Sequence, residues 1–194
     1  MLDDVRVLGM ESGAVIIDDS VEVWPHNKRN LIVVKRYTYF PSSRRQFGLD
    51  GPALLDADCD ESVASGILSS SLAFIERIHH SFFFSHSHDM DVRSILAAEQ
   101  GKILAGCRIV FSQIFPVEEA NPHLHPLWQA AENCGAVCSN QIDEQVTHVV
   151  AKSLGTDKVR WAQSTGRFVV HWRWIEASSQ LYQRAKELDF AIKK

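Results

Sequence analysis

The sequence predicts an α/β protein in two parts, and three observations carry this prediction. A run of branched apolar residues near the N-terminus stops at two adjacent aspartates, Asp18 and Asp19. Apolar residues then recur at helical spacing across residues 68–82. From Lys102 onward, short strand-like runs alternate with helix-like segments. Because strands that alternate with helices form parallel sheets covered by helices, we expect such a sheet in the second part.

The first predicted strand is the run from Val15 to Ile17, and its C-terminal end carries Asp18 and Asp19. A run of branched apolar residues predicts a strand buried in a parallel sheet, and such sheets bind ligands beyond the carboxyl ends of their strands. Neighbouring carboxylates repel each other unless they share a cation, and Mg²⁺ prefers oxygen ligands. The pair therefore predicts a magnesium site, or half of one. The alternative is that Asp19 or Ser20 caps a helix.

The elements that follow are a second strand, a loop and two helices. Residues 31–34 form another branched apolar run and predict the second strand. Residues 49–71 are rich in Gly, Asp and Ser, which predicts a loop. The periodicity of residues 68–82 predicts an amphipathic helix, and a further helix is expected to start by Asp91 and to lead to Gly101. We expect these two helices to connect the two parts of the chain.

The second part is predicted to contain four strands, at residues 102–112, 136–138, 147–151 and 167–171. Gly135 should end a helix that begins at Pro126, and Thr156 should cap a short helix that Gly166 ends. A final helix is expected to place one face against the sheet, with the members Trp174, Ser178, Leu181, Ala185 and Leu188. Together these elements predict a small four-stranded parallel sheet flanked by helices on both sides.

Three segments of the first part carry a resemblance to a known family: Asp18–Trp24, Leu31–Val34 and Tyr37–Gly48. They resemble the last acidic motif of the TFIIF-associating C-terminal-domain phosphatases, and in particular the plant C-terminal-domain-phosphatase-like members. That family belongs to the haloacid-dehalogenase superfamily and removes phosphate from serines in the heptad tail of RNA polymerase II. The resemblance implies a partial haloacid-dehalogenase-like, Rossmann-like domain in this chain.

The same resemblance implies the roles of the two aspartates. Asp19 would be a direct Mg²⁺ ligand and Asp18 its close partner. The family's nucleophile is the first Asp of an Asp-x-Asp-x-Thr motif, and a Lys from another motif steadies the phosphoryl group; neither has a counterpart in this sequence. Since phosphoryl transfer of this type needs an attacking carboxylate and a proton donor, we expect no catalytic residues in this chain. One carboxylate pair without further ligands should hold Mg²⁺ weakly.

The second part resembles a BRCT domain over residues 101–191. The likeness rests on the order of the elements, on the Gly135–Ala136 turn, on the strand Thr147–Val150 and on Trp174. The phosphatases named above carry a BRCT domain after their catalytic domain, so both parts point to one family. One departure is the Trp172–Arg173 pair, where BRCT domains commonly have a Pro or Ser and a small residue.

BRCT domains that bind phosphopeptides suggest a second candidate site. By the resemblance, the phosphate would contact the Ser112 hydroxyl, the backbone N–H of Gln113 and the Lys158 ammonium. Charge-assisted hydrogen bonds from such donors suit phosphate recognition. Gln113 stands where the family has Gly, so its side chain could cover the site. The alternative is that Ser112 is an ordinary serine at the end of a strand and that Lys158 is a solvated helix residue.

These observations predict three segments. Residues 1–48 would be the C-terminal remnant of a phosphatase catalytic domain, residues 49–100 a loop with bridging helices, and residues 101–191 the BRCT domain. The expected function is that of a fragment of a serine phosphatase for the polymerase heptad tail, inactive alone. The alternatives are a non-catalytic phosphopeptide-binding or scaffolding protein in transcription, and an unrelated binding protein with a borrowed BRCT domain.

Composition limits the remaining possibilities. The chain has 194 residues, 45% hydrophobic content and a net charge of −4, which predicts a globular protein and gives no general case for direct nucleic-acid binding. Its four cysteines have no framework spacing and predict free thiols in a reducing compartment. No apolar run approaches membrane length, and the first residues are too acidic for a targeting peptide. By the resemblance, we expect a nuclear protein whose partners are the phosphorylated polymerase tail and transcription factor IIF.

Overall fold

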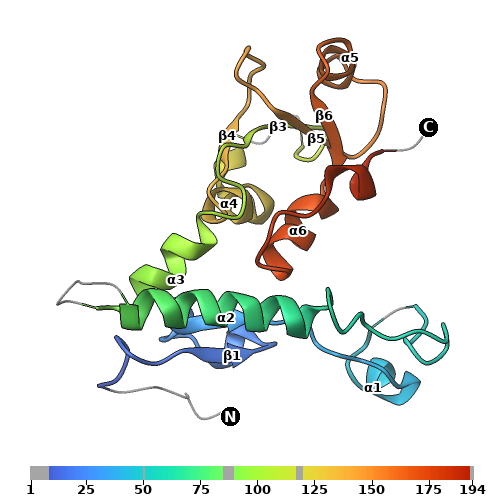
Figure 1. The fold of residues 1–194 in the computed structure, drawn as a ribbon. Helices are drawn as coiled ribbons and strands as arrows, with labels where there is room; N and C mark the ends of the chain where they lie inside the picture. The colour runs from blue at the N-terminus through green and yellow to red at the C-terminus, as the bar shows by residue number, and fades with distance from the viewer. Residues whose placement is uncertain (1–8, 50, 85–89, 117–119, 193–194) are drawn as a thin grey trace. The chain divides into compact units, whose positions relative to one another are not determined.

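The computed structural model divides into two compact units, residues 1–92 and residues 93–194, here called the N-terminal and the C-terminal unit (Figure 1). It describes residues 9–49, 51–84, 90–116 and 120–192. Within these ranges, none of the helices has the length and apolar character needed to cross a membrane. All four cysteines are unpaired, as predicted.

The N-terminal unit contains a parallel pair of strands and two helices: β1 (Ile16–Asp18), β2 (Leu31–Val33), α1 (Pro41–Gln46) and α2 (Ile67–Phe84). The predicted order of strand, loop, strand and amphipathic helix is confirmed. Helix α1 was not expected from the sequence, and Pro41 starts it at a position where a missing backbone N–H costs nothing. The helix α2 buries Phe74 and Ile78 on one face.

Burial in the β1–β2 pair differs from the prediction of a fully buried strand. Ile16 and Ile32 are buried, but Ile17 is 53% exposed and Val33 is 38% exposed. Successive side chains of a strand point to opposite faces, so the buried neighbours Leu31 and Ile32 show that both faces are covered at the start of β2, whereas Ile17 and Val33 are partly open to solvent. The side chain of Asn30, just before β2, is buried and donates a hydrogen bond to a backbone carbonyl ahead of β1, which ties the two strands together.

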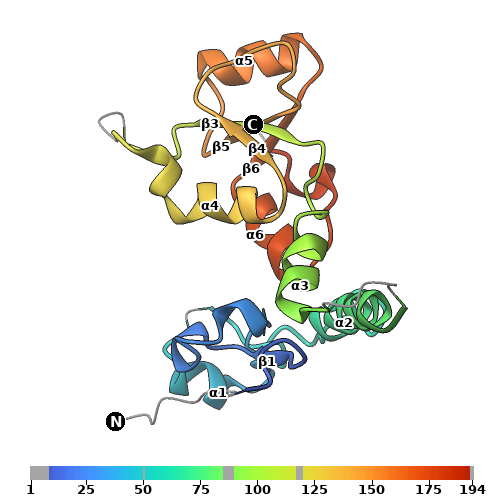
Figure 2. The same cartoon turned by 90° about the vertical axis from the view of Figure 1, so that its left-hand side faces the viewer.

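The C-terminal unit is a four-stranded sheet covered by helices on both faces (Figure 2). All strand pairs are parallel, and the spatial order is β4-β3-β5-β6. The elements are α3 (Val92–Gln100), β3 (Arg108–Ser112), α4 (Pro126–Asn133), β4 (Val137–Ser139), β5 (His148–Ala151), α5 (Asp157–Ser164), β6 (Phe168–His171) and α6 (Arg173–Gln180). The predicted small parallel sheet is therefore confirmed, although its first strand begins six residues later than expected.

Strand β5 runs through the middle of the core, and all of its residues are buried. Val149 and Ala151 point to one face, where they pack with Val159 and Ala162 of α5. His148 points to the other face and stacks on a tryptophan of α6. Since successive residues of a strand alternate between faces, a strand buried on both sides needs the near-continuous apolar run that the sequence shows here.

Two predicted helix ends are found where the sequence places them. The Thr156 hydroxyl accepts a hydrogen bond from the Val159 backbone N–H at 3.2 Å and caps α5. Gly135 follows α4 with φ +91°, a backbone conformation that residues with a Cβ rarely adopt. A Cβ added to Gly135 would lie 1.8 Å from the carbonyl oxygen of Gly101. The glycine is therefore required both by its backbone conformation and by the close approach of another chain segment.

The final predicted helix is too long. Helix α6 ends at Gln180, and Tyr182 lies beyond it in a left-handed conformation with φ +50°. The Ala185 carbonyl turns back to accept a hydrogen bond from the indole N–H of Trp174 at 2.8 Å. Leu188, which the prediction placed on the apolar helix face, is 82% exposed and lies in a 3-10 turn, η4 (Glu187–Phe190). The indole needs a hydrogen-bond acceptor in the core, and a continued helix could not supply one.

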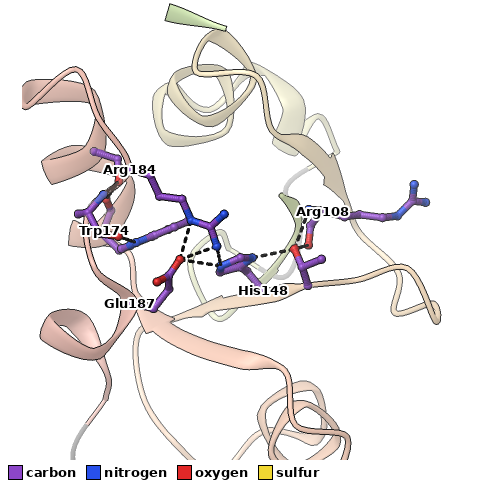
Figure 3. A network of polar contacts seen from close by, with 8 residues as sticks. Arg108, His148, Trp174, Arg184 and Glu187 are labelled. Carbon is purple, nitrogen blue, oxygen red and sulfur yellow. Dashed lines mark hydrogen bonds and ion pairs between the residues drawn. The ribbon is translucent and has the colours of Figure 1, made fainter. Parts of the chain in front are cut away.

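A buried histidine joins the sheet to this C-terminal segment (Figure 3). The His148 ring is 1% exposed and stacks on Trp174 with ring centroids 4.7 Å apart. Its Nδ1 contacts the Thr147 hydroxyl at 2.7 Å, and its Nε2 lies 3.4 Å from Glu187, which also pairs with Arg184. Burial lowers the pKa of His148 to about 4, so the ring is neutral at neutral pH.

This histidine makes the stability of the C-terminal unit depend on pH. Between pH 6.5 and 4 the unfolded chain binds a proton at His148 that the folded chain excludes, so stability falls as the pH falls through this window. The loss should reach on the order of 3 kcal/mol at the acidic end. Urea unfolding at pH 7 and pH 4 measures this loss. In the His148→Phe variant this part of the pH dependence should vanish, and an unchanged slope would contradict the assignment.

Candidate functional site

The two aspartates at the end of β1 play different parts. The carboxylate of Asp18 accepts hydrogen bonds from the Ser20 backbone N–H at 2.8 Å and from the Trp24 indole N–H at 3.0 Å. These bonds fix the turn that follows β1. Trp24, which lies six residues after Asp18 in the motif identified from the sequence, therefore helps to hold this turn. Ser20 precedes the 3-10 turn Val21–Val23, but its side chain makes no capping hydrogen bond.

Asp19 is held by an arginine from the segment that follows the other strand. Two N–H groups of Arg36, which follows β2, bond to the two carboxylate oxygens of Asp19. Hydrogen bonding from this guanidinium lowers the pKa of Asp19 below its usual range. The guanidinium also lies 3.9 Å from the centre of the Phe47 ring, so it is sandwiched between an anion and an aromatic face. Asp19 is therefore ionised and oriented.

A hollow of about 360 Å³ opens beside these groups. Asp18, Asp19, Lys35, Arg36 and Glu61 contribute its polar lining. The oxygens suit Mg²⁺ in kind, because this ion is usually bound by one or two carboxylates together with water and substrate phosphate. In the ranges that the structure describes, however, no three metal-binding side chains are grouped, and Arg36 already occupies Asp19. The acidic pair fits one part of a magnesium centre and does not form a complete one.

The second candidate site lies at the carboxyl end of β3. The three residues predicted there, Ser112, Gln113 and Lys158, come close together, but each bonds to a different partner. The Ser112 side chain is buried, and its hydroxyl lies 2.7 Å from the Thr156 hydroxyl. Gln113 follows with φ +56°, the left-handed conformation that glycine adopts at no cost. Its side-chain oxygen accepts a hydrogen bond from Ser153 at 2.9 Å. The Gln113 side chain is thus held by a neighbouring loop.

Lys158, on the first turns of α5, reaches back to the end of the same strand. Its ammonium donates to the backbone carbonyls of Phe111, at 3.0 Å, and of Asn140, at 2.9 Å. Burial lowers the pKa of Lys158. An ammonium has three N–H groups, so one remains that the described residues do not engage. The alternative of a freely solvated lysine is therefore wrong.

Lys158 and Gln113 line one pocket of about 310 Å³, together with Phe115, Asn140 and other residues. This pocket, here called the lysine pocket, is mostly polar in its lining. Ser112 is not among its lining residues, because its hydroxyl points to Thr156. The Lys158 ammonium and the exposed polar groups of this pocket can bind an anion. Ser112 does not line the pocket and contacts Thr156 instead.

Several residues of these sites were not found from the sequence. Arg36, Ser153, Asn140 and Thr156 all contact the predicted site residues. Thr156 was expected only as a helix cap, and it serves as one while it also holds Ser112. Arg36 stands in an ordinary pair of basic residues after a strand, and nothing in that pattern indicates that it would face an aspartate 17 positions earlier.

Comparisons with known proteins agree with this architecture. The family model described as the BRCA1 C Terminus (BRCT) domain matches residues 99–179. The chain is 67% identical over 187 residues to RNA polymerase II C-terminal domain phosphatase-like 3 of Arabidopsis thaliana, covering 96% of this chain and 15% of that protein. It is 42% identical to phosphatase-like 4 of the same organism, covering 96% of this chain and 43% of that protein.

Among solved structures, the chain is similar to that of Fcp1, an essential RNA polymerase II CTD phosphatase. The TM-score is 0.63, the sequence identity is 23%, and the match covers 94% of this chain and 61% of the other. At this identity the likeness shows the fold alone. The chain thus spans less than two thirds of each of the proteins compared here.

Proposed function

Because this chain belongs, over the region that it spans, to the family of RNA polymerase II C-terminal domain phosphatases, we propose that it is part of a serine phosphatase acting on the heptad tail of that polymerase. The observation that carries the proposal is the 67% identity with a protein of that name along nearly the whole chain. The N-terminal unit would be the end of a haloacid-dehalogenase-like catalytic domain, and the C-terminal unit its BRCT domain. The proposed setting is nuclear transcription, with transcription factor IIF as a further partner.

Asp19 and Asp18 would contribute to the magnesium centre of the whole enzyme. Bound Mg²⁺ would supply the positive charge that phosphoryl transfer needs on the developing oxyanions. The Asp18 carboxylate keeps the turn after β1 in shape through Ser20 and Trp24. Arg36 keeps Asp19 ionised and oriented in the absence of another cation. The attacking carboxylate and the proton donor would come from residues outside this sequence.

Hydrolysis of polymerase heptad phosphopeptides by the intact protein that contains this chain is the test. We expect Mg²⁺-dependent phosphate release, and we expect Asp19→Asn to lower kcat/KM by about 100-fold or more, since a charged metal ligand is lost. The matched control is Lys35→Ala, which removes another charge from the lining of the same hollow. If Asp19→Asn retains full activity, Asp19 is no part of the magnesium centre.

A second function is favoured by the lysine pocket. We propose that the C-terminal unit binds phosphorylated peptides, whether or not catalysis occurs elsewhere in the protein. Phosphate oxygens would accept hydrogen bonds from the Lys158 ammonium and from the backbone N–H of Gln113. Ser112 would keep Thr156 and the start of α5 in place rather than contact the phosphate. In this alternative the protein is a phosphopeptide-binding or scaffolding component of the transcription machinery.

Replacing Lys158 tests this binding function directly. Lys158→Met keeps the apolar stem and removes the charge, so we expect about tenfold or more weaker binding of a heptad phosphoserine peptide, which corresponds to a loss of about 1.4 kcal/mol. Fluorescence anisotropy of a labelled peptide measures it. Lys186→Ala, which removes a charge at an exposed position of the same unit, should leave binding unchanged. Equal affinity for the phosphorylated and unphosphorylated peptides would refute phosphate recognition.

A further inference from the structure

Arg36 holds the carboxylate that is proposed as a metal ligand. Its guanidinium bonds to both oxygens of Asp19, with Nη2 2.9 Å from Oδ1. Each oxygen of the neighbouring Asp18 also accepts a hydrogen bond, one from the Ser20 backbone N–H and one from the Trp24 indole. The bonds of Asp18 are part of the turn after β1, whereas the bonds of Asp19 come from a single side chain. A metal ion that binds Asp19 therefore meets one competitor, Arg36.

A divalent ion and the Arg36 guanidinium are alternative partners of this carboxylate. Two cations bound to one carboxylate repel each other, and the repulsion is strong at short range. The side chains of Arg36 and Asp19 are only 35% and 27% exposed, so solvent screens these charges incompletely. A divalent ion carries twice the charge of the guanidinium, and its attraction to Asp18 and Asp19 together can offset the two hydrogen bonds that are lost.

Phe47 gives the guanidinium a second contact that does not depend on Asp19. The Arg36 guanidinium lies 3.9 Å from the centre of the Phe47 ring. A cation–π contact of this kind can persist when the carboxylate binds another cation, because it needs only the face of the ring. Arg36 also follows β2 rather than lying within it, so its side chain can turn without breaking the β1–β2 pair. Release of Asp19 would therefore require no rearrangement of the sheet.

We propose that Arg36 holds Asp19 in the metal-free protein, that a divalent ion displaces it, and that this competition lowers the metal affinity of the site. The inference rests on the proposed magnesium role of Asp19 and adds to it a residue that sets how tightly the ion is held. Before the ion binds, the adjacent carboxylates of Asp18 and Asp19 would repel each other without a cation. Arg36 supplies that cation and keeps Asp19 oriented, and it weakens metal binding at the same time.

Binding of Mn²⁺, which accepts the same oxygen ligands as Mg²⁺, to the intact protein that contains this chain tests the competition. Electron paramagnetic resonance measures the free ion, and the part of the binding that Asp19→Asn abolishes belongs to this site. For that part, we expect Arg36→Met to bind Mn²⁺ about fivefold more tightly than the unmodified protein, because the competing partner is removed. A purely structural role of Arg36 would give the opposite result, weaker binding.

Two further variants serve as controls. Arg36→Lys keeps the charge but loses the planar pair of N–H groups, so its affinity should lie between those of the unmodified protein and of Arg36→Met. Lys35→Met removes a neighbouring charge from the lining of the same hollow. It should change the affinity by less than about twofold, since a charge that does not hold Asp19 acts only through the surrounding field.

The Arg36 Nε–H group gives a readout that needs no substitution. Its NMR signal, assigned by its absence in Arg36→Lys, should shift and exchange faster with water as Mg²⁺ is added, because the bond to Asp19 is released. If Arg36→Met fails to fold, this signal decides alone, and an unmoved signal at saturating Mg²⁺ overturns the inference.

The failure of this inference differs from the failure of the proposed function. If Asp19→Asn abolishes Mn²⁺ binding but Arg36→Met binds the ion equally well or more weakly, the competition is refuted and the magnesium role of Asp19 stands. If Asp19→Asn leaves Mn²⁺ binding unchanged, the magnesium role fails and the inference fails with it. Tighter binding in Arg36→Met, together with loss of binding in Asp19→Asn, supports both.

Discussion

Trp174→Ala is expected to destabilise the C-terminal unit by about 3–5 kcal/mol, the largest effect among the core substitutions considered. The Trp174 side chain is fully buried, stacks on His148 and donates its indole N–H to the Ala185 carbonyl. The substitution leaves a cavity, removes the stacking partner of a buried ring and leaves a buried carbonyl without its donor. Each of these losses is costly in a closely packed interior.

Hydrogen exchange of the β5 amides measures this loss within the C-terminal unit, since these amides exchange only when the sheet opens. Trp174→Phe separates the two contributions, because it retains most of the packing and removes the hydrogen bond, and it should cost about 1–3 kcal/mol. Trp161→Ala, which removes an indole that is only partly buried, should cost less than Trp174→Ala. Equal losses of stability in Trp161→Ala and Trp174→Ala would show that the burial, stacking and hydrogen bond of Trp174 do not account for its contribution.

Gly135→Ala is the second substitution with a large expected effect. The added Cβ would lie 1.8 Å from the Gly101 carbonyl oxygen, and that neighbour is backbone, which cannot rotate away as a side chain can. The positive φ of Gly135 adds the strain that any residue with a Cβ meets there. We expect a loss of more than about 2 kcal/mol in the free energy of unfolding, because the turn after α4 must move.

The chain offers a matched control for this substitution. Gly106 also has a positive φ, +80°, but an added Cβ would meet nothing within 4 Å. Gly106→Ala should therefore show only the conformational strain, about 1 kcal/mol. The difference between the two variants in urea unfolding isolates the steric clash. If both variants lose the same free energy of unfolding, the backbone at Gly101 moves to accommodate the added Cβ and the clash contributes nothing.

The elements that the sequence predicted correctly are those with strong local signals. Strand β5 is a continuous apolar run because both of its faces are buried, and α5 begins at a threonine cap and ends before a glycine. Helix α2 lies where the periodicity predicts a helix, but its buried face carries Phe74 and Ile78, while Leu68 and Leu72 of the periodic run are 78% and 56% exposed. In each case the residues that determine the structure lie within a few positions of one another, so a pattern in the sequence suffices.

The sequence-based predictions miss features of the structure that depend on residues far away in the sequence. Helix α6 stops early because the Trp174 indole is paired with the Ala185 carbonyl, and no local pattern indicates that bond. The assignment of Asp18 and Asp19 as metal ligands stays a prediction, but the sequence did not indicate the bond between Asp19 and Arg36, which joins segments that follow two different strands. Gln113 was recognised as a departure from glycine, but its link to Ser153 comes from the fold. Contacts of this kind depend on tertiary structure.

The strand order of the C-terminal unit also governs how this unit can form on the ribosome. β3 is synthesised first, yet it lies inside the sheet and pairs with both β4 and β5, while the acceptor for Trp174 is Ala185. Parallel pairing of this kind closes long loops before it gains contacts, which makes it slow. The nascent strand keeps unpaired edges until β4 and β5 have been synthesised, and Trp174 gains its acceptor only when Ala185 follows. The core of the unit is therefore completed only when the residues after α6 have been synthesised.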